Sequence, residues 1–252
     1  MLRMRQIALV ARELKPVEDD LRAILGLEVC YRDPGVGRFG LHNFLMPVGN
    51  AFLEVVAPIE EGTAGGRYLD RRGGDGGYMV IMQTDDVASA RERVLGLGVR
   101  LVLDSGAGAN AGIQLHPKDV PGAIVELRQN EGDQDPAGPW GPAGPDWRPA
   151  QRLDVTRRLS AAEIQSEDPA ALAARWSQVL ARPLEGDAAG PELALDDATL
   201  RFVEAADGRG EGLGGLDVEV ADREHVLREA EARGCRTGES TLLIGGTRFN
   251  LD

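Results

Sequence analysis

The sequence predicts an α+β protein built from four βαβββ modules. An apolar strand is followed, roughly fifty residues later, by a strand that carries one acid among apolar neighbours, and the first half of the chain contains this pattern twice. Between these strands lie an amphipathic helix and further short strands broken by turn residues. A Pro- and Gly-rich segment over residues 131–150 then separates this half from a second half with similar strand and helix signals.

The first module covers residues 1–58. Its apolar strand (QIALVA) begins at Gln6, and the helix that follows starts near Pro16 and ends at Gly26. Val17, Leu21, Ile24 and Leu25 lie on one face of that helix. The last strand of the module (AFLEVVAP) contains Glu54.

The second module covers residues 76–130 and repeats this order. Its first strand (MVIMQT) leads to Asp85 and Asp86, which are candidate helix caps, and Gly98 closes the helix. The last strand (GAIVELRQ) carries Glu126. Together these modules predict an N-terminal domain over residues 1–130.

The second half is predicted to contain modules over residues 151–205 and 213–252, which form a C-terminal domain over residues 151–252. In the third module a strand is expected from Leu153 to Thr156, and Asp168 opens a helix. In the fourth module the strand LDVEVA precedes a helix that starts at Asp222 and stops at Gly234. Trp140 and Trp147, in the linker between the halves, are predicted to pack it onto the domains.

Charge and apolar patterning limit the classes of partner. The chain has 41 acidic against 28 basic residues and a net charge of −13, without a basic block, so nucleic acid and membranes are not expected as partners. No apolar run approaches the ~20 residues of a membrane span, and a cytoplasmic location is expected. Cys30 and Cys235 have no CxxC spacing and are predicted to be reduced structural thiols.

Glu54 and Glu126 are the main candidates for function. Side chains of a strand alternate between its faces, so either acid, if it points inward, lies in an apolar interior. A buried carboxylate must be paired, protonated or bound to a metal. Two such acids close together would have separated pKa values, and one could act as a general base. The alternative is that both face solvent or pair with a nearby arginine.

Other polar residues give weaker signals. His42 and Asn43 lie next to each other in a predicted strand and are candidates to line a cavity, although a structural or exposed role is favoured for His42. The basic cluster RYLDRR, residues 67–72, could hold an anionic group, but a solvated loop is the preferred interpretation.

Two longer motifs, GLHNFLMPVGNAFLEVVAP and IQLHPKDVPGAIVEL, together with the repeated modules, resemble the vicinal oxygen chelate superfamily. This superfamily includes glyoxalase I, methylmalonyl-CoA epimerase, extradiol dioxygenases and bleomycin-resistance proteins. The resemblance covers residues 1–130 well and residues 151–252 in outline. It implies that two modules form one open barrel, so the four modules would form two glyoxalase-like open barrels.

The resemblance also implies a metal site with one ligand from the first and last strand of each module. The corresponding residues are Gln6, Glu54, Met79 and Glu126. A thioether is a poor ligand for hard or borderline ions, so Met79 leaves Gln6, Glu54 and Glu126 as the metal ligands for Zn, Ni, Co, Mn or Mg, or else leaves no metal.

The positions in the second half fall at Glu204 and Asn250, near Arg152 or Asp154, and near Gly215. No metal is expected there, and a scaffolding role is favoured.

Three functions follow from this resemblance, all with a small-molecule ligand. The first is a metal-dependent isomerase, epimerase or lyase with Glu54 and Glu126 as catalytic residues. The second is a metal-free binding protein of the antibiotic-sequestering type. The third, an extradiol dioxygenase, lacks the two histidines and one carboxylate that bind iron. A monomer with two barrels and a homodimer are both compatible with the sequence.

Overall fold

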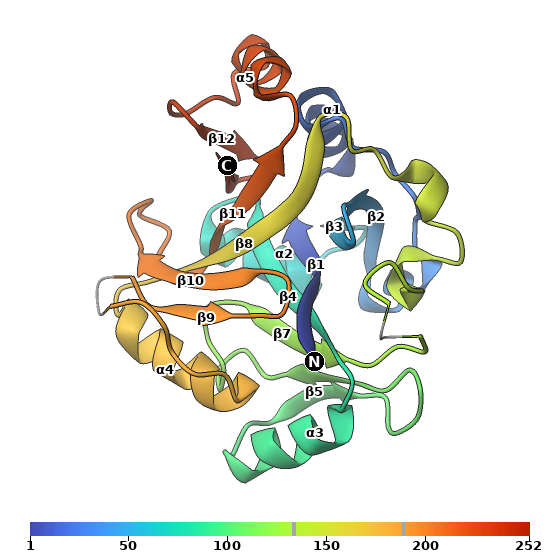
Figure 1. Ribbon diagram of the computed structural model, residues 1–252, viewed down its shortest axis with the longest axis vertical. Coiled ribbons are helices and arrows are strands. Elements are labelled where there is room, and N and C mark those ends of the chain that lie inside the picture. Colours follow the sequence, from blue (N-terminus) through green and yellow to red (C-terminus); the bar gives the residue numbers. More distant parts are fainter. Residues whose placement is uncertain (133–134, 188–189) are drawn as a thin grey trace. The chain divides into compact units, whose positions relative to one another are not determined.

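A computed structural model describes residues 1–132, 135–187 and 190–252 of the chain (Figure 1). It confirms an α+β fold with two mixed sheets. The first sheet has the strand order β2-β3-β1-β4-β7-β6-β5, and the second has the order β12-β13-β11-β8-β10-β9. None of the helices in the described residues has the length and apolar character of a membrane span.

The strands of the first sheet all precede residue 130. They are β1 Leu2–Val10, β2 Leu41–Val48, β3 Ala51–Pro58, β4 Gly76–Thr84, β5 Leu101–Asp104, β6 Gly112–Leu115 and β7 Ile124–Arg128. The strands of the second sheet all follow residue 155. They are β8 Thr156–Ser166, β9 Glu192–Ala194, β10 Thr199–Glu204, β11 Gly212–Val220, β12 Thr241–Ile244 and β13 Thr247–Leu251. The helices are α1 Leu14–Leu25, α2 Ala64–Arg72, α3 Val87–Gly96, α4 Pro169–Leu180 and α5 Arg223–Ala232, with short 3-10 turns at η1 Pro34–Phe39, η2 Gly141–Ala143 and η3 Arg148–Ala150.

Three helices begin at the aspartates that the sequence predicts. The side chains of Asp86, Asp168 and Asp222 each accept a hydrogen bond from the backbone N–H three residues ahead, at 2.9, 3.0 and 2.9 Å. Such a bond satisfies one of the amide groups that the first turn of a helix leaves without an intrahelical partner. Helix α1 ends at Gly26, whose φ of 67° is a left-handed conformation that glycine adopts without a steric penalty.

Two elements differ from the sequence prediction. The third module begins with β8, which starts at Thr156, so the strand expected from Leu153 lies almost entirely before it. The small and polar residues of β8 have weak strand propensity. The strand forms because it lies between β11 and β10 in the sheet, and its residues 161–166 pair in parallel with β10. The cluster RYLDRR forms helix α2 rather than a loop, because Thr63 caps the helix and the helix buries Leu69.

The described residues divide into two compact units. Unit 1 contains residues 1–6, 78–139 and 161–213, and unit 2 contains residues 7–77, 140–160 and 214–252. Each sheet therefore comes from one half of the sequence, whereas each unit takes modules from both halves. The division into domains 1–130 and 151–252 stays a prediction.

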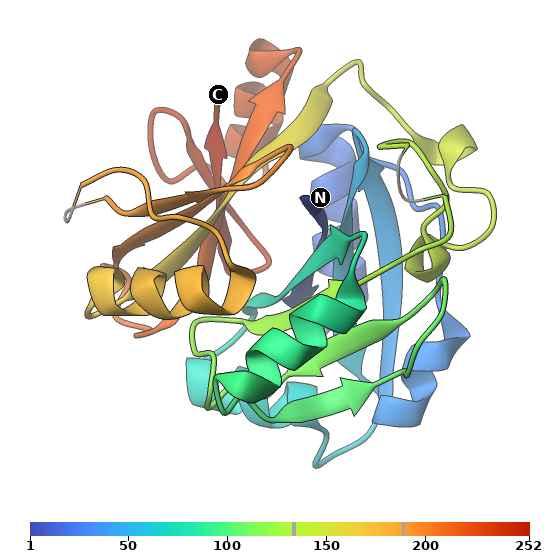
Figure 2. The ribbon, with the colours of Figure 1, turned by 60° about the horizontal axis from the view of Figure 1, so that its bottom comes forward.

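Unit 1 has α3 and α4 as its helices (Figure 2). Helix α3 packs against β6 and β7, and α4 packs against β9 and β10. Trp176 anchors α4, because its Nε1 donates to the carbonyl of Pro121 at 2.8 Å and its ring meets that of Phe202 edge-on. The buried aromatic area stabilises this part of unit 1.

Unit 2 contains α1, α2 and α5 and the part of the linker from residue 140 on, which includes both tryptophans. Both indole rings are buried, and Trp147 meets Phe52 of β3 edge-on at 5.1 Å between ring centroids. The prediction that these tryptophans pack the linker onto the fold is confirmed.

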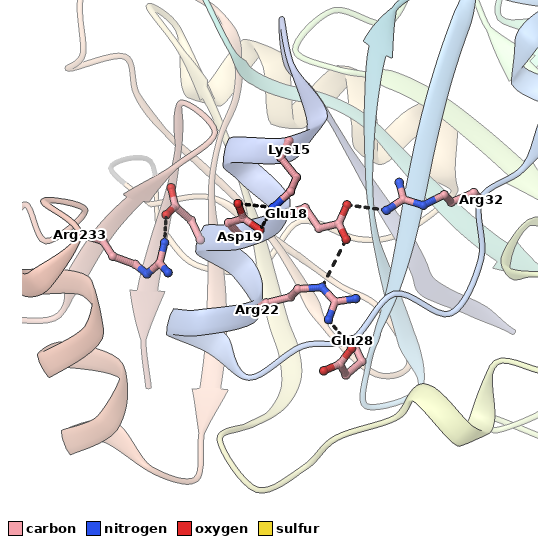
Figure 3. A network of polar contacts seen from close by, with 8 residues as sticks. Lys15, Glu18, Asp19, Arg22, Glu28, Arg32 and Arg233 are labelled. Carbon is pink, nitrogen blue, oxygen red and sulfur yellow. Dashed lines mark hydrogen bonds and ion pairs between the residues drawn. The ribbon is translucent and has the colours of Figure 1, made fainter.

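A polar network lies on α1 within unit 2 (Figure 3). Glu18 is buried and pairs with Arg22 at 3.3 Å and with Arg32 at 2.6 Å. Asp20 pairs with Arg233 at 2.9 Å, in the residues that follow α5. These ion pairs join α1 to neighbouring segments, and we assign them a structural role.

Candidate functional site

Glu54 lies in unit 2, on β3, with 7% of its surface exposed. The antiparallel register of β2 and β3 pairs Leu45 with Glu54 and Asn43 with Val56, so Asn43 and Glu54 are diagonal neighbours on one face. The Nδ2 of Asn43 donates a hydrogen bond to Oε1 of Glu54 at 2.6 Å. The structure thus brings together two residues that the sequence predicts for separate roles.

A turn before β2 sets the orientation of the Asn43 amide. The backbone N–H of Asp33 donates to Oδ1 of Asn43 at 2.8 Å, and Asp33 itself caps η1 through the N–H of Gly35. A backbone N–H can only donate, so the amide oxygen must face Asp33 and the amide nitrogen must face Glu54. The chain therefore presents a fixed N–H donor to the Glu54 carboxylate.

The surroundings of this pair are poorly solvated. Cys30 lies beside Leu45, the cross-strand partner of Glu54, and its thiol contacts the carbonyl oxygen of Leu45 at 3.3 Å. Burial raises the pKa of the Cys30 thiol to about 11. The shift follows from burial of this thiol, and Asn43 and Glu54 beside it are themselves buried.

His42 occupies the other face of the same hairpin. It is adjacent to Asn43 in β2, and side chains alternate, so it points away from the face that carries Glu54. Its side chain is exposed. A role for His42 in a cavity stays a prediction.

Unit 1 contains the other three residues predicted as metal positions. Gln6 is buried on β1, Met79 is half-buried on β4, and Glu126 lies on β7. The parallel register pairs Met79 with Ile124 and Ile81 with Glu126, so Met79 and Glu126 lie on the same face of neighbouring strands.

Glu126 is paired with an arginine of its own strand. The Nη1 of Arg128 lies 3.1 Å from Oε1 of Glu126, and the two side chains are 29% and 16% exposed. A Cβ built on Gly112, the cross-strand partner of Arg128, would stand 3.6 Å from both side chains, so this glycine lies directly beside the pair.

The three predicted metal positions in unit 1 do not offer a set of ligand atoms that fits a divalent metal ion. Met79 offers a thioether, Gln6 an amide, and the carboxylate of Glu126 already holds a guanidinium. Hard and borderline ions require oxygen or nitrogen ligands with enough negative charge to balance their own. Within the described parts of the chain, no three His, Cys, Asp or Glu side chains form a group that could hold an ion.

The C-terminal sheet contains two acids that the sequence reasoning missed. The modules can be aligned on their helix caps, because Met79, Ala161 and Gly215 each lie the same number of residues before the capping aspartate. The strand pair Met79–Ile124 then corresponds to Ala161–Thr199 and to Gly215–Arg248. Glu126 lies two residues after Ile124. The equivalent residues, two after Thr199 and two after Arg248, are Arg201 and Asn250.

These two residues hold acids on the adjacent first strands. Arg201 donates to Glu163 at 3.0 Å, and Asn250 donates to Asp217 at 2.9 Å. Glu204, the position expected from the sequence, lies on β10 three residues beyond Arg201. Arg152 and Asp154 lie before β8. The acids in the strands AAEIQS and LDVEV were the available sequence signal, but only the register shows their partners.

Unit 2 also has a surface pocket of about 480 Å³ beside α2. Its lining includes Arg12, Glu60, Arg67 and Asp70, and Arg12 pairs with Asp70 at 3.1 Å. Acidic and basic side chains of this pocket are mixed, so the basic character expected for RYLDRR is offset locally.

Comparison with known proteins identifies the class. The family model of the glyoxalase-like domain matches residues 7–180. The chain belongs to the glyoxalase-like domain family, within the vicinal oxygen chelate superfamily.

Three relatives illustrate the range of this class. The ethylmalonyl-CoA/methylmalonyl-CoA epimerase of Cereibacter sphaeroides is 28% identical over 132 residues, which cover 50% of this chain and 97% of the epimerase. A hypothetical protein from Staphylococcus aureus has a crystal structure with a TM-score of 0.68 and 11% identity, covering 100% of this chain and 99% of that one. A mutant 4-hydroxymandelate synthase from Streptomyces coelicolor gives a TM-score of 0.67 and 16% identity over 94% of this chain and 77% of the synthase. The two structural matches show a shared fold.

Proposed function

We propose that this protein transfers a proton at a carbon next to a carbonyl group in a small molecule, with Glu54 as the general base. The observation that carries the proposal is the buried Glu54 carboxylate with the fixed Asn43 amide donating to it at 2.6 Å. The similarity of the first half to an epimerase of acyl-CoA substrates supports the same chemistry.

The proposed step balances within Glu54 and the substrate. The ionised carboxylate takes the proton from the carbon, and the electron pair of the C–H bond moves toward the carbonyl to form an enolate. Return of the proton to carbon restores both the carbonyl and the ionised Glu54, so the outcome is epimerisation or isomerisation. Asn43 holds Oε1 and thereby fixes the plane of the carboxylate.

The test is hydrogen exchange at that carbon in D2O, followed by NMR, with methylmalonyl-CoA as the first probe. We expect the protein to accelerate exchange over the uncatalysed background and Glu54→Gln to lower the rate by about 100-fold or more. Glu239→Gln changes an exposed acid of the same unit, away from the α2 pocket, and should leave the rate unchanged. Retained activity in Glu54→Gln would refute the role of this base.

A second candidate is a metal-free protein that only binds a small molecule. It is favoured by the Glu126–Arg128 pair, which is charge-neutral as a whole. A ligand that raises the melting temperature in the presence of EDTA, without exchange or turnover, would support this candidate over the first. The roles predicted for Gln6, His42 and Glu126 as ligand, cavity and catalytic residues stay predictions.

A further inference from the structure

We infer that Arg128 is the resident cation of the Glu126 site and that its guanidinium takes the place of a divalent metal ion there. The two side chains lie on one strand, two residues apart and on one face, with Nη1 of Arg128 at 3.1 Å from Oε1 of Glu126. Both are partly buried, so solvent screens their attraction less than it would at an open surface.

The neighbouring strands supply no second charge for a metal ion. Glu126 is the one acid in β4, β6 and β7, whose sequences are GGYMVIMQT, GIQL and IVELR. Its cross-strand partner on β6 is Gln114, an uncharged amide, and Met79 shares its face on β4. The guanidinium therefore already balances the single negative charge that these strands contain.

The guanidinium of Arg128 has a further N–H donor that does not contact Glu126. Its Nε–H is buried and has no hydrogen-bond partner among the described residues. An unpaired buried donor is unfavourable and suits an incoming oxygen acceptor. This guanidinium therefore disfavours a second cation beside Glu126.

The inference is independent of proton transfer by Glu54, because it concerns metal affinity alone. Its test uses the whole chain, stripped with EDTA and titrated with Co²⁺, whose visible absorption reports protein ligands, and with Zn²⁺ by calorimetry. The variants are Met79→His, Arg128→Met, the double variant of both, and the double variant with Glu126→Gln.

The wild type and Met79→His should show no Glu126-dependent metal binding, because Arg128 remains in place. The double variant should bind Co²⁺ at least about 100-fold more tightly than Met79→His, and Glu126→Gln should abolish this gain. Arg100→Met in the Met79→His background is the matched control, because it removes an arginine of the same unit that pairs with Asp119 instead. That control should gain nothing.

Two results would overturn the inference. One is stoichiometric, Glu126-dependent metal binding by the wild type or by Met79→His. The other is a double variant that has the circular dichroism of the wild type but binds Co²⁺ no more tightly than Met79→His. Measurements on the unaltered chain keep the inference testable even if the double variant does not fold.

Discussion

The two compact units hold their strand acids with different partners. In unit 1, arginines donate to Glu126 at 3.1 Å and to Glu163 at 3.0 Å. In unit 2, asparagines donate to Glu54 at 2.6 Å and to Asp217 at 2.9 Å. Each unit combines a module from each half of the sequence, so the type of partner follows the unit and not the half.

This difference separates two chemical roles. A guanidinium carries a full charge and strongly stabilises an ionised carboxylate, which lowers its affinity for a proton. An amide orients a carboxylate through one hydrogen bond but adds no charge. The arginine donors of unit 1 therefore place a positive charge beside their acids, whereas the amide donors of unit 2 do not.

The largest expected effect comes from placing a second carboxylate in the amide position of unit 2. Asn43→Asp keeps the acceptor for Asp33 but puts two acids 2.6 Å apart, so the pair must share a proton. We expect a loss of ~3 kcal/mol in the free energy of unfolding at pH 8.

The effect should depend on pH in a defined direction. The shared proton means a pKa raised above the unfolded value of about 4, so stability is present at low pH and lost as pH rises through the raised pKa. Urea unfolding at pH 5 and pH 8 measures this loss. Asn50→Asp, at an exposed turn position, serves as the control, and an equal loss at both pH values would contradict the expected repulsion.

A smaller effect compares the two kinds of partner in the C-terminal sheet. Arg201→Met removes a charged donor from Glu163 and should lower the free energy of unfolding by ~2 kcal/mol. Asn250→Ala removes a neutral donor from Asp217 and should lower it by ~1 kcal/mol. Urea unfolding at pH 7 measures both, and equal losses would remove the energetic distinction between the units.

The smallest effect concerns the environment beside Glu54. With a pKa of about 11, Cys30 is ionised in roughly one molecule in a thousand at pH 8. The higher pKa also makes its thiolate a stronger nucleophile than that of free cysteine, which offsets part of the loss. We expect its reaction with a disulfide reagent to be about 20-fold slower than that of a free cysteine. The rate is measured as the difference between the wild type and Cys30→Ser, with the urea-unfolded chain as reference. A rate equal to that of free cysteine would mean that this part of unit 2 is well solvated, and the comparison would then rest on the partners alone.

Much of the fold was predictable because its signals are local. The caps at Asp86, Asp168 and Asp222 and the end of α1 at Gly26 each depend on a few consecutive residues, and the structure confirms them. The start of β8 and helix α2 were not predicted correctly. Their sequences have weak intrinsic preferences. Strand β8 forms between β11 and β10 of the second sheet, and burial of Leu69 stabilises α2.

The candidate site was predictable only in part. The sequence indicated Glu54 and Glu126 as the acids to consider and named Asn43 as a separate cavity residue. It did not indicate that Arg128, two places from Glu126, takes that carboxylate, nor that Glu163 and Asp217 are the acids of the second half. One alternative from the sequence was that these acids pair with a nearby arginine, and Glu126 does so with Arg128.

The α+β class, the modular repeat and the places where helices start can be read from the amino-acid sequence, because they depend on neighbours along the chain. The donor that each acid meets depends on contacts made in the folded chain. Asn43 and Glu54 are 11 residues apart and Arg201 and Glu163 are 38 apart, and strand register brings each pair into contact. A shift of one residue would turn the side chains of a strand to its other face, so the chemistry of these acids depends on a register that no local pattern specifies.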